Sequence, residues 1–130
     1  MELEELTNYQ FMIALTDLDV YNLAEELSDM IWNDYDQWPK KAQWTIGLQA
    51  IRAADSIAAN LAEGYGRFTA PDRKKFYLYS RGSLEEAKTW LRKAKSRGLV
   101  AEDRDLRYNL LLEKLGPKLN GFINSTRNTE

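Results

Sequence analysis

One predicted helix, residues 41–63, carries polar side chains that recur every three or four residues. At about 100° per residue they fall within an arc of about 80°, beside the apolar face of that helix. A buried polar group without a partner costs about 1–3 kcal/mol, so these side chains need hydrogen-bond partners. Amide, guanidinium, hydroxyl and carboxylate groups at this spacing could form either a hydrogen-bond network or a small polar pocket. This polar row consists of Gln49, Arg52, Ser56, Asn60 and Glu63.

The partners expected for the polar row lie in the turn after it and on the next predicted helix. Arg67 would stand beside Glu63 at the mouth of a pocket, and the next helix supplies Arg81, Ser83 and Glu86. A network between helices or between subunits would fix how they pack. The first alternative is a pocket in which Glu63 transfers a proton, but no second acid or base stands at a matching spacing. The second alternative is a surface that binds a partner.

A second set of side chains could bind phosphate or an acidic protein surface. Five cations align on one face of the predicted helix that follows Thr69. We expect this face to lie about 140° from an apolar line centred on Ser83 and Ala87, and therefore to point outward. The cations, called the basic row below, are Lys74, Arg81, Lys88, Arg92 and Lys95.

The charges along the chain are uneven although the net charge is only −2. Residues 1–39 contain ten Asp or Glu and no Lys or Arg, whereas residues 72–97 contain nine Lys or Arg and three acids. Three interpretations follow for the basic row. It could meet the acidic face of another subunit in a head-to-tail ring. It could simply be solvated, or it could bind a nucleic-acid backbone, with Tyr77, Tyr79 and Trp90 near it for base stacking.

The sequence contains no histidine and no cysteine. Zinc sites built on those residues, Ser-His-Asp triads, Cys-His pairs and histidine-containing di-iron sites are therefore excluded. We expect no metal, no cofactor and no enzymatic activity. A disulfide framework is impossible, no apolar run approaches the ~20 residues of a membrane helix, and the N-terminus does not resemble a signal peptide. We therefore expect a cytoplasmic protein that does not enter a membrane.

Apolar residues at helical spacing predict four helices in one domain of 130 residues. They cover residues 17–38, 41–63, 70–98 and 103–123. Thr69 should cap the third helix, and Gly64 should end the second in a left-handed conformation. Gly116 and Pro117 should weaken or kink the fourth. Around the first turn, Trp32, Tyr35, Trp38 and Trp44 could form either a hydrophobic cap on the bundle or an exposed interface patch.

Four helices joined by short links predict an all-α, antiparallel bundle with up-down-up-down order. We expect an N-terminal extension over residues 1–14, the bundle over residues 15–125 and a C-terminal tail over residues 126–130.

Several blocks of the sequence resemble one known family. They are Gln49-x-x-Arg52-Ala53-Ala54-x-Ser56-Ile57, Asn60-Leu61-Ala62-Glu63-Gly64-x-Gly66-Arg67, Arg81-Gly82-Ser83-Leu84-x-Glu86 with Trp90-Leu91, and Leu18-x-Val20-Tyr21 in the first helix. Over about residues 11–125 the chain is similar to the bacterial four-helix-bundle proteins first met as reading frames in intervening sequences of large-subunit ribosomal RNA genes.

This resemblance implies the bundle fold and a homo-oligomer, typically a five-fold ring. A distant branch of the family serves reverse transcriptases in diversity-generating retroelements and binds nucleic acid with a basic surface. The resemblance therefore implies self-association first, with a nucleic acid or another protein as a possible further partner.

Overall fold

Four long helices make up the part of the chain that the computed structural model describes, residues 13–126. They are α2 (Asp19–Tyr35), α4 (Leu48–Tyr65), α5 (Ala70–Ser96) and α6 (Glu102–Thr126). A short 3-10 turn, η1 (Leu15–Asp17), precedes α2, and α3 (Lys40–Ala42) leads through a π-helical turn, η2 (Gln43–Gly47), into α4. No strand occurs within these residues. The predicted all-α class is confirmed.

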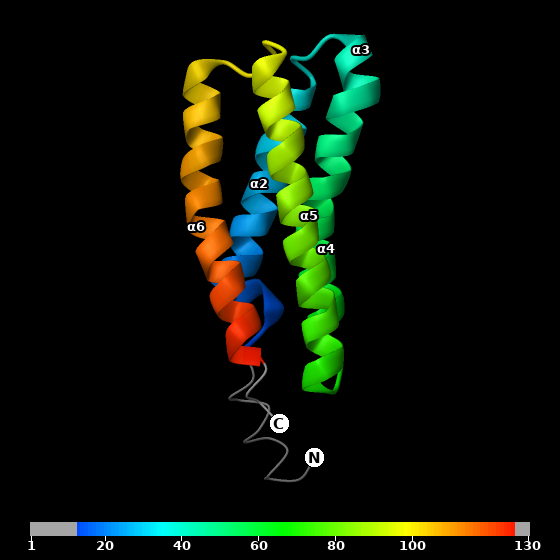
Figure 1. Cartoon of the computed structure of the whole chain (residues 1–130), viewed down its shortest axis with the longest axis vertical. Helices are drawn as coiled ribbons and strands as arrows, with labels where there is room; N and C mark the ends of the chain where they lie inside the picture. The colour runs from blue at the N-terminus through cyan, green and yellow to red at the C-terminus, as the bar shows by residue number, and fades with distance from the viewer. Residues whose placement is uncertain (1–12, 127–130) are drawn as a thin grey trace.

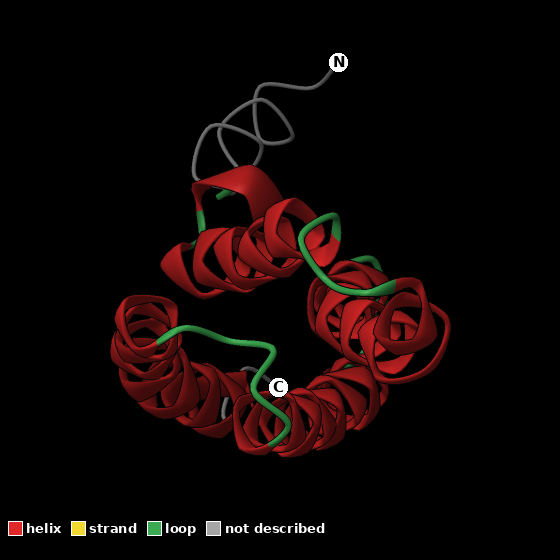
Figure 2. Cartoon of the chain, turned by 90° about the horizontal axis from the view of Figure 1, so that it is seen from above, coloured by secondary structure: helices red, strands yellow, loops and turns green. Residues whose placement is uncertain are grey.

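The helices form the predicted four-helix bundle, and each runs opposite to the one before it (Figure 1). Seen from above, they occupy four corners around one core (Figure 2). Each of α2 and α5 packs against both α4 and α6, and the contact between α4 and α5 is the most extensive. Helices α2 and α5 are therefore diagonal to each other, on opposite sides of the bundle.

The ends of α5 follow the sequence signals. The Thr69 hydroxyl oxygen accepts a hydrogen bond from the Asp72 amide at 3.3 Å, which caps the first turn as predicted. At the other end, Gly98 has a φ of +75°, and the Leu99 amide bonds to the Ala94 carbonyl at 2.9 Å. This left-handed glycine after the last turn satisfies carbonyls that would otherwise lack partners.

Gly64 does not end its helix, and the prediction of a left-handed cap there is wrong. Helix α4 continues to Tyr65, and no described residue other than Gly98 has a positive φ. Gly64 is instead buried where α4 meets α5. A Cβ atom at this position would lie 2.6 Å from Cε1 of Tyr77. The glycine is thus a packing requirement, since the Tyr77 ring occupies the space of a side chain.

The core face of α5 is also rotated from the predicted one. Tyr77 and Leu84 are buried, whereas Phe76 and Ser83 are only half-buried. The fully buried positions of the helix follow one another at intervals of three and four: Tyr77, Ser80, Leu84, Ala87, Leu91 and Ala94. At about 100° per residue, the basic row lies about 90° from this line and not about 140° from it. It therefore borders the neighbouring helix α6.

The predicted boundaries fall partly outside the described residues. Of the expected extension over residues 1–14, the structure describes only Ile13 and Ala14, and of the expected tail only Thr126, which closes α6. Helix α6 continues through Pro117 without a break. Among the helices described, none is long and apolar enough to cross a membrane.

Candidate functional site

The polar row on α4 bonds mainly to its own helix. The Ser56 hydroxyl donates to the Arg52 carbonyl at 2.8 Å, and the Asn60 side-chain amide donates to the Ser56 carbonyl at 2.8 Å. Gln49, Arg52 and Glu63 are exposed. Ser and Asn side chains often satisfy themselves in this way on a helix. Within the described residues, no hydrogen bond or ion pair joins this row to α5.

The expected partners on α5 behave in the same way. Arg81 and Glu86 are exposed, and Glu86 accepts a hydrogen bond from Nε1 of Trp90 at 3.3 Å, one turn along its own helix. Ser83 is half-buried. The two helices are joined instead by Ser80, whose buried hydroxyl donates to the Ile57 carbonyl at 2.8 Å. The predicted network is therefore not formed between α4 and α5 of one chain, while its intersubunit form stays a prediction.

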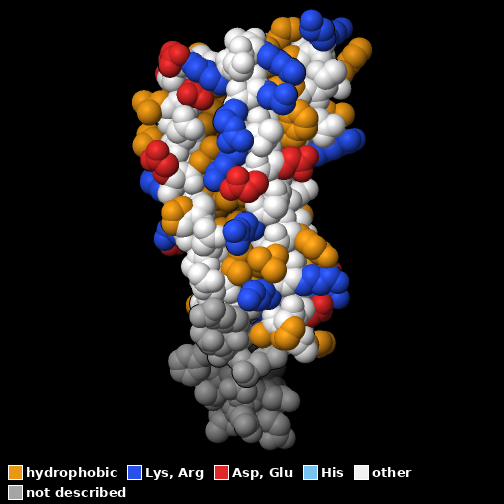
Figure 3. Space-filling model, in the orientation of Figure 1, with side chains coloured by type: hydrophobic (Ala, Val, Ile, Leu, Met, Phe, Trp, Pro, Cys, Tyr) orange, Lys and Arg blue, Asp and Glu red, His pale blue; other side chains and the backbone are white. Residues whose placement is uncertain are grey.

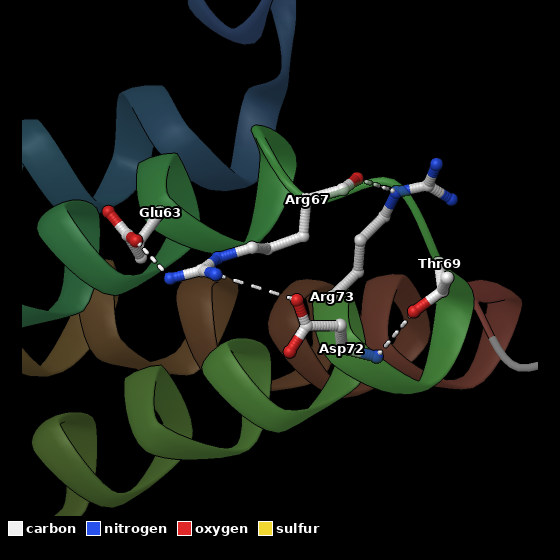
Figure 4. Close-up of polar contacts among 5 residues, drawn as sticks. All are labelled: Glu63, Arg67, Thr69, Asp72 and Arg73. Carbon is white, nitrogen blue, oxygen red and sulfur yellow. Dashed lines mark hydrogen bonds and ion pairs between the residues drawn. The ribbon is translucent and has the colours of Figure 1, made fainter.

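Glu63 and Arg67 do meet, in the turn that joins α4 to α5 (Figure 4). Nη2 of Arg67 lies 2.6 Å from Oε1 of Glu63, and Nη1 lies 3.6 Å from Oδ2 of Asp72. The guanidinium also stacks over the Phe76 ring at 4.6 Å. The Glu63 side chain is paired with Arg67 across the turn, and at 53% exposure it lacks the deep burial that the proton-transfer alternative required. A shallow hollow of about 630 Å³ beside it is lined by Ala62, Glu63, Gly66, Arg67, Phe68, Thr69 and Asp72.

Sequence reasoning missed Arg73, which fixes this turn from the α5 side. Its Nε donates to the Arg67 carbonyl at 2.8 Å and its Nη2 to the Phe68 carbonyl at 2.6 Å. Figure 4 shows that Arg67 and Arg73 reach in opposite directions across the turn. The position of Arg73, two residues after Pro71, was the available signal, since it lies in the first turn of α5, beside the preceding loop.

A second missed cluster joins α2 to α6. Oδ2 of Asp34 accepts hydrogen bonds from Nε of Arg104 at 3.0 Å and from the Tyr108 hydroxyl at 2.6 Å. Burial, followed by the bond to Asp34, raises the pKa of Tyr108. The Asp34 carboxylate also raises the pKa of Arg104. This cluster ties the two helices near one end of the bundle.

The basic row lies on the face of the molecule shown in Figure 3, where Lys and Arg side chains gather along α5. Lys88, Arg92 and Lys95 form one wall of an open groove of about 680 Å³ between α5 and α6. Apolar side chains of Leu91 and Leu112 are among those that line it. The opposite wall, from α6, carries Asp105, Asn109, Glu113 and Asn120. The expectation of a purely outward basic face is therefore corrected, because three of the five cations line a groove.

The cations of the basic row are only partly neutralised. Lys88 pairs with Glu85 at 3.1 Å, and Lys95 pairs with Glu102 across the α5–α6 loop. Arg92 donates only to the Thr89 hydroxyl, at 3.2 Å. Arg81 is exposed and forms no ion pair with any described residue, and Lys74 is half-buried.

Helix α2 carries the opposite charge on the opposite side of the bundle. It contains five acids and no Lys or Arg. Asp19 faces α6 and pairs with Lys118 at 3.5 Å. Another set of side chains, spaced by four, three and four residues, forms a straight row that points away from α6. This set, called the α2 row, is Glu25, Asp29, Trp32 and Asp36.

The four aromatic residues around the first turn are divided between the two interpretations. Trp38 is buried at 5% exposure and packs against Tyr35, with ring centroids 6.5 Å apart. Trp32 and Trp44 are 65% and 71% exposed. The cluster is thus partly a cap and partly a surface.

Residues 13–126 contain no group of three or more acidic side chains placed to hold a metal ion. The most prominent charged features of the described surface are two charged rows on opposite faces of the bundle.

Comparisons with known proteins identify the family and a related fold. A family model described as "23S rRNA-intervening sequence protein" matches residues 16–121. Comparison with curated proteins gives no match. Among solved structures, the chain is similar to a Bacteroides thetaiotaomicron protein of unknown function from the S23 ribosomal protein family. The TM-score is 0.73 at 18% identity, over 80% of this chain and 97% of that one, a likeness of fold. With most of its length matched by the family model, the chain belongs to the family of 23S rRNA-intervening sequence proteins.

Proposed function

We propose that this protein is a self-assembling helical bundle with no enzymatic activity, which acts as a scaffold or adaptor in the cytoplasm. The resemblance to its family favours a closed ring of five subunits. The observation that carries the proposal is the separation of charge: the acidic α2 and the basic α5 lie diagonally, on opposite sides of the bundle.

This separation supports contacts between copies because neither charge can neutralise the other within one chain. Opposite faces of complementary charge suit a head-to-tail contact, in which each subunit uses one face for each neighbour. Two exposed tryptophans, Trp32 and Trp44, add the type of side chain that is enriched at the centre of protein interfaces.

The test is native mass spectrometry at micromolar protein, at low and moderate salt, with and without a short RNA hairpin. A closed oligomer without RNA is the expected result, and a monomer under all conditions would contradict self-assembly.

A nucleic-acid-binding accessory is the second candidate, and the basic row on α5 is the observation that favours it. In that case RNA would be bound to the protein at low salt and released as salt rises, because phosphate contacts displace counterions. Reversal of Lys74, Arg81, Lys88, Arg92 and Lys95 should then abolish binding, whereas unchanged affinity would exclude this role.

A further inference from the structure

We propose that the α2 row of one copy docks against the α5–α6 groove of the next copy, with Glu25 beside Lys88, Asp29 beside Arg92 and Trp32 beside Lys95. This contact rests on the proposed self-assembly and specifies its geometry. Its site is incomplete in a single chain, because each copy contributes only one of the two surfaces at each contact.

The spacing of the two rows is the first argument. Glu25 and Asp29 are four residues apart, as are Lys88 and Arg92, so each pair of positions is separated by about 6 Å along its helix. Trp32 follows Asp29 by three residues, and Lys95 follows Arg92 by three. Two parallel helices therefore bring all three pairs into register at once. The third pair places an ammonium group near an indole ring, which attracts cations.

The shared direction of the two helices is the second argument, and their relative height sets how the copies must stand. Helices α2 and α5 run the same way in the bundle (Figure 1), so copies that stand side by side present them in parallel. Ion pairs fix the levels within one chain: Asp34 lies level with Arg104 and Tyr108, and Lys95 lies level with Glu102. Counting about 1.5 Å per residue from these points puts Glu25 about 6–12 Å, or roughly one to two helical turns, below the height of Lys88.

The difference in height has a consequence for the assembly. A head-to-tail contact that advances along the axis generates an open helical filament, whereas one without a rise can close into a ring. Because the matched residues differ in height by roughly one to two helical turns within one bundle, a closed ring requires neighbouring subunits to be tilted relative to the ring axis.

The chemistry of the two surfaces is the third argument for a second copy as the occupant. Glu25, Asp29 and Asp36 form no ion pair with any described residue, and Arg92 has only a hydroxyl partner. Leu91 and Leu112 give the groove apolar surface, and the 65%-exposed Trp32 is the large apolar side chain of the opposing row. Charge pairs around a desolvated aromatic residue are the usual anatomy of a specific interface.

Charge reversal tests the contact on the full chain. One variant carries Glu25→Lys and Asp29→Lys, a second carries Lys88→Glu and Arg92→Glu, and a third carries all four changes. Each two-residue variant should dissociate, with the subunit affinity weakened at least about 100-fold. The four-residue variant should assemble again, since its pairs are complementary with the signs exchanged.

A mixture of the two-residue variants gives a sharper result. Each variant repels itself on this contact but attracts the other, so the two must alternate. An alternating ring can contain only an even number of subunits, so a five-membered closed ring should be absent from the equimolar mixture.

Lys75→Glu with Lys93→Glu is the matched control, since these exposed lysines lie on α5 outside the basic row. It makes the same change in charge as Lys88→Glu with Arg92→Glu and should leave assembly intact. Dissociation of this control would mean that net charge alone is responsible and would overturn the contact. Wild-type assembly by a folded two-residue variant, or failure of the four-residue variant to reassemble, would also overturn it. A monomeric wild-type protein, by contrast, would contradict the proposed function itself.

Discussion

Replacing Gly64 by alanine should destabilise the bundle at the closest approach of α4 and α5. The added Cβ would lie 2.6 and 2.8 Å from two carbons of the Tyr77 ring and 2.9 Å from the Arg73 carbonyl oxygen. The ring cannot turn aside easily, because it is 1% exposed and packs against Phe122 at a centroid distance of 4.8 Å. The helices must therefore separate locally, or the ring must leave its favoured position.

The expected magnitude is the difference between two opposing effects. Alanine is favoured over glycine inside a helix by up to about 1 kcal/mol. Overpacking a tight core costs about 1–3 kcal/mol, and the contact with a backbone oxygen places this site toward the upper end. We expect a net loss of about 1–2 kcal/mol in the free energy of unfolding, which corresponds to a decrease in Tm of roughly 4–8 °C for a domain of this size.

Gly82→Ala is the control, because a Cβ at that exposed position of α5 would meet nothing within 4 Å. It should stabilise the protein by about 0.5–1 kcal/mol through helix propensity alone. Urea denaturation followed by circular dichroism measures both. A Gly64→Ala protein as stable as Gly82→Ala would refute the steric argument. In a Tyr77→Leu background the Gly64→Ala penalty should shrink, since the two positions are directly coupled.

Two further predictions concern side chains that the sequence did not single out. Asp34→Ala leaves Arg104 and Tyr108 without their shared acceptor and should lower the free energy of unfolding, measured with denaturant, by about 2–3 kcal/mol. The control Glu26→Ala, on the exposed face of α2, should lower it by less than about 0.5 kcal/mol. Equal losses would contradict the role of the cluster. Burial raises the pKa of Tyr77 from 10.0 to about 12, so the stability that its neutral form contributes is complete below pH 10.0 and is lost as the pH rises towards about 12. Titration followed by phenolate absorbance should show a step at high pH that the Tyr77→Phe variant lacks. If the variant titrates like the wild-type protein, the burial of this hydroxyl is contradicted.

The sequence predicted the elements well because their end signals are local. Thr69 and Gly98 each act within one turn of the chain, and both helix ends are where those residues indicated. The rotation of α5 could not be obtained in this way. Phe76 and Ser83 occupy one helical line and Tyr77 and Leu84 the adjacent line, so periodicity leaves a choice of one residue that only the neighbouring helices decide.

The candidate site was predicted less completely, for two physical reasons. A serine or asparagine on a helix can bond to its own backbone or to a neighbour, and spacing alone does not distinguish them, as Ser56 and Asn60 demonstrate. The Asp34 cluster joins residues 70 and 74 positions apart, which no local pattern connects. The basic row was visible in the sequence because its alignment depends only on the period of one helix.

The π-helical turn η2 lets the two parts of one continuous helical segment pack against different neighbours, each in its own rotation about the helix axis. In this turn the Leu48 amide bonds to the Gln43 carbonyl, five residues back, so the turn holds one residue more than an α-helical turn. Within the turn, the Gln43 side-chain amide donates to the Tyr35 carbonyl at 3.1 Å, and Gly47 leaves room for the Tyr35 ring. After it, α4 is phased by its contact with α5. The extra residue changes the helical register between the two parts. A one-residue insertion or deletion upstream of Leu48 can therefore be accommodated in this turn without rotating α4 against α5.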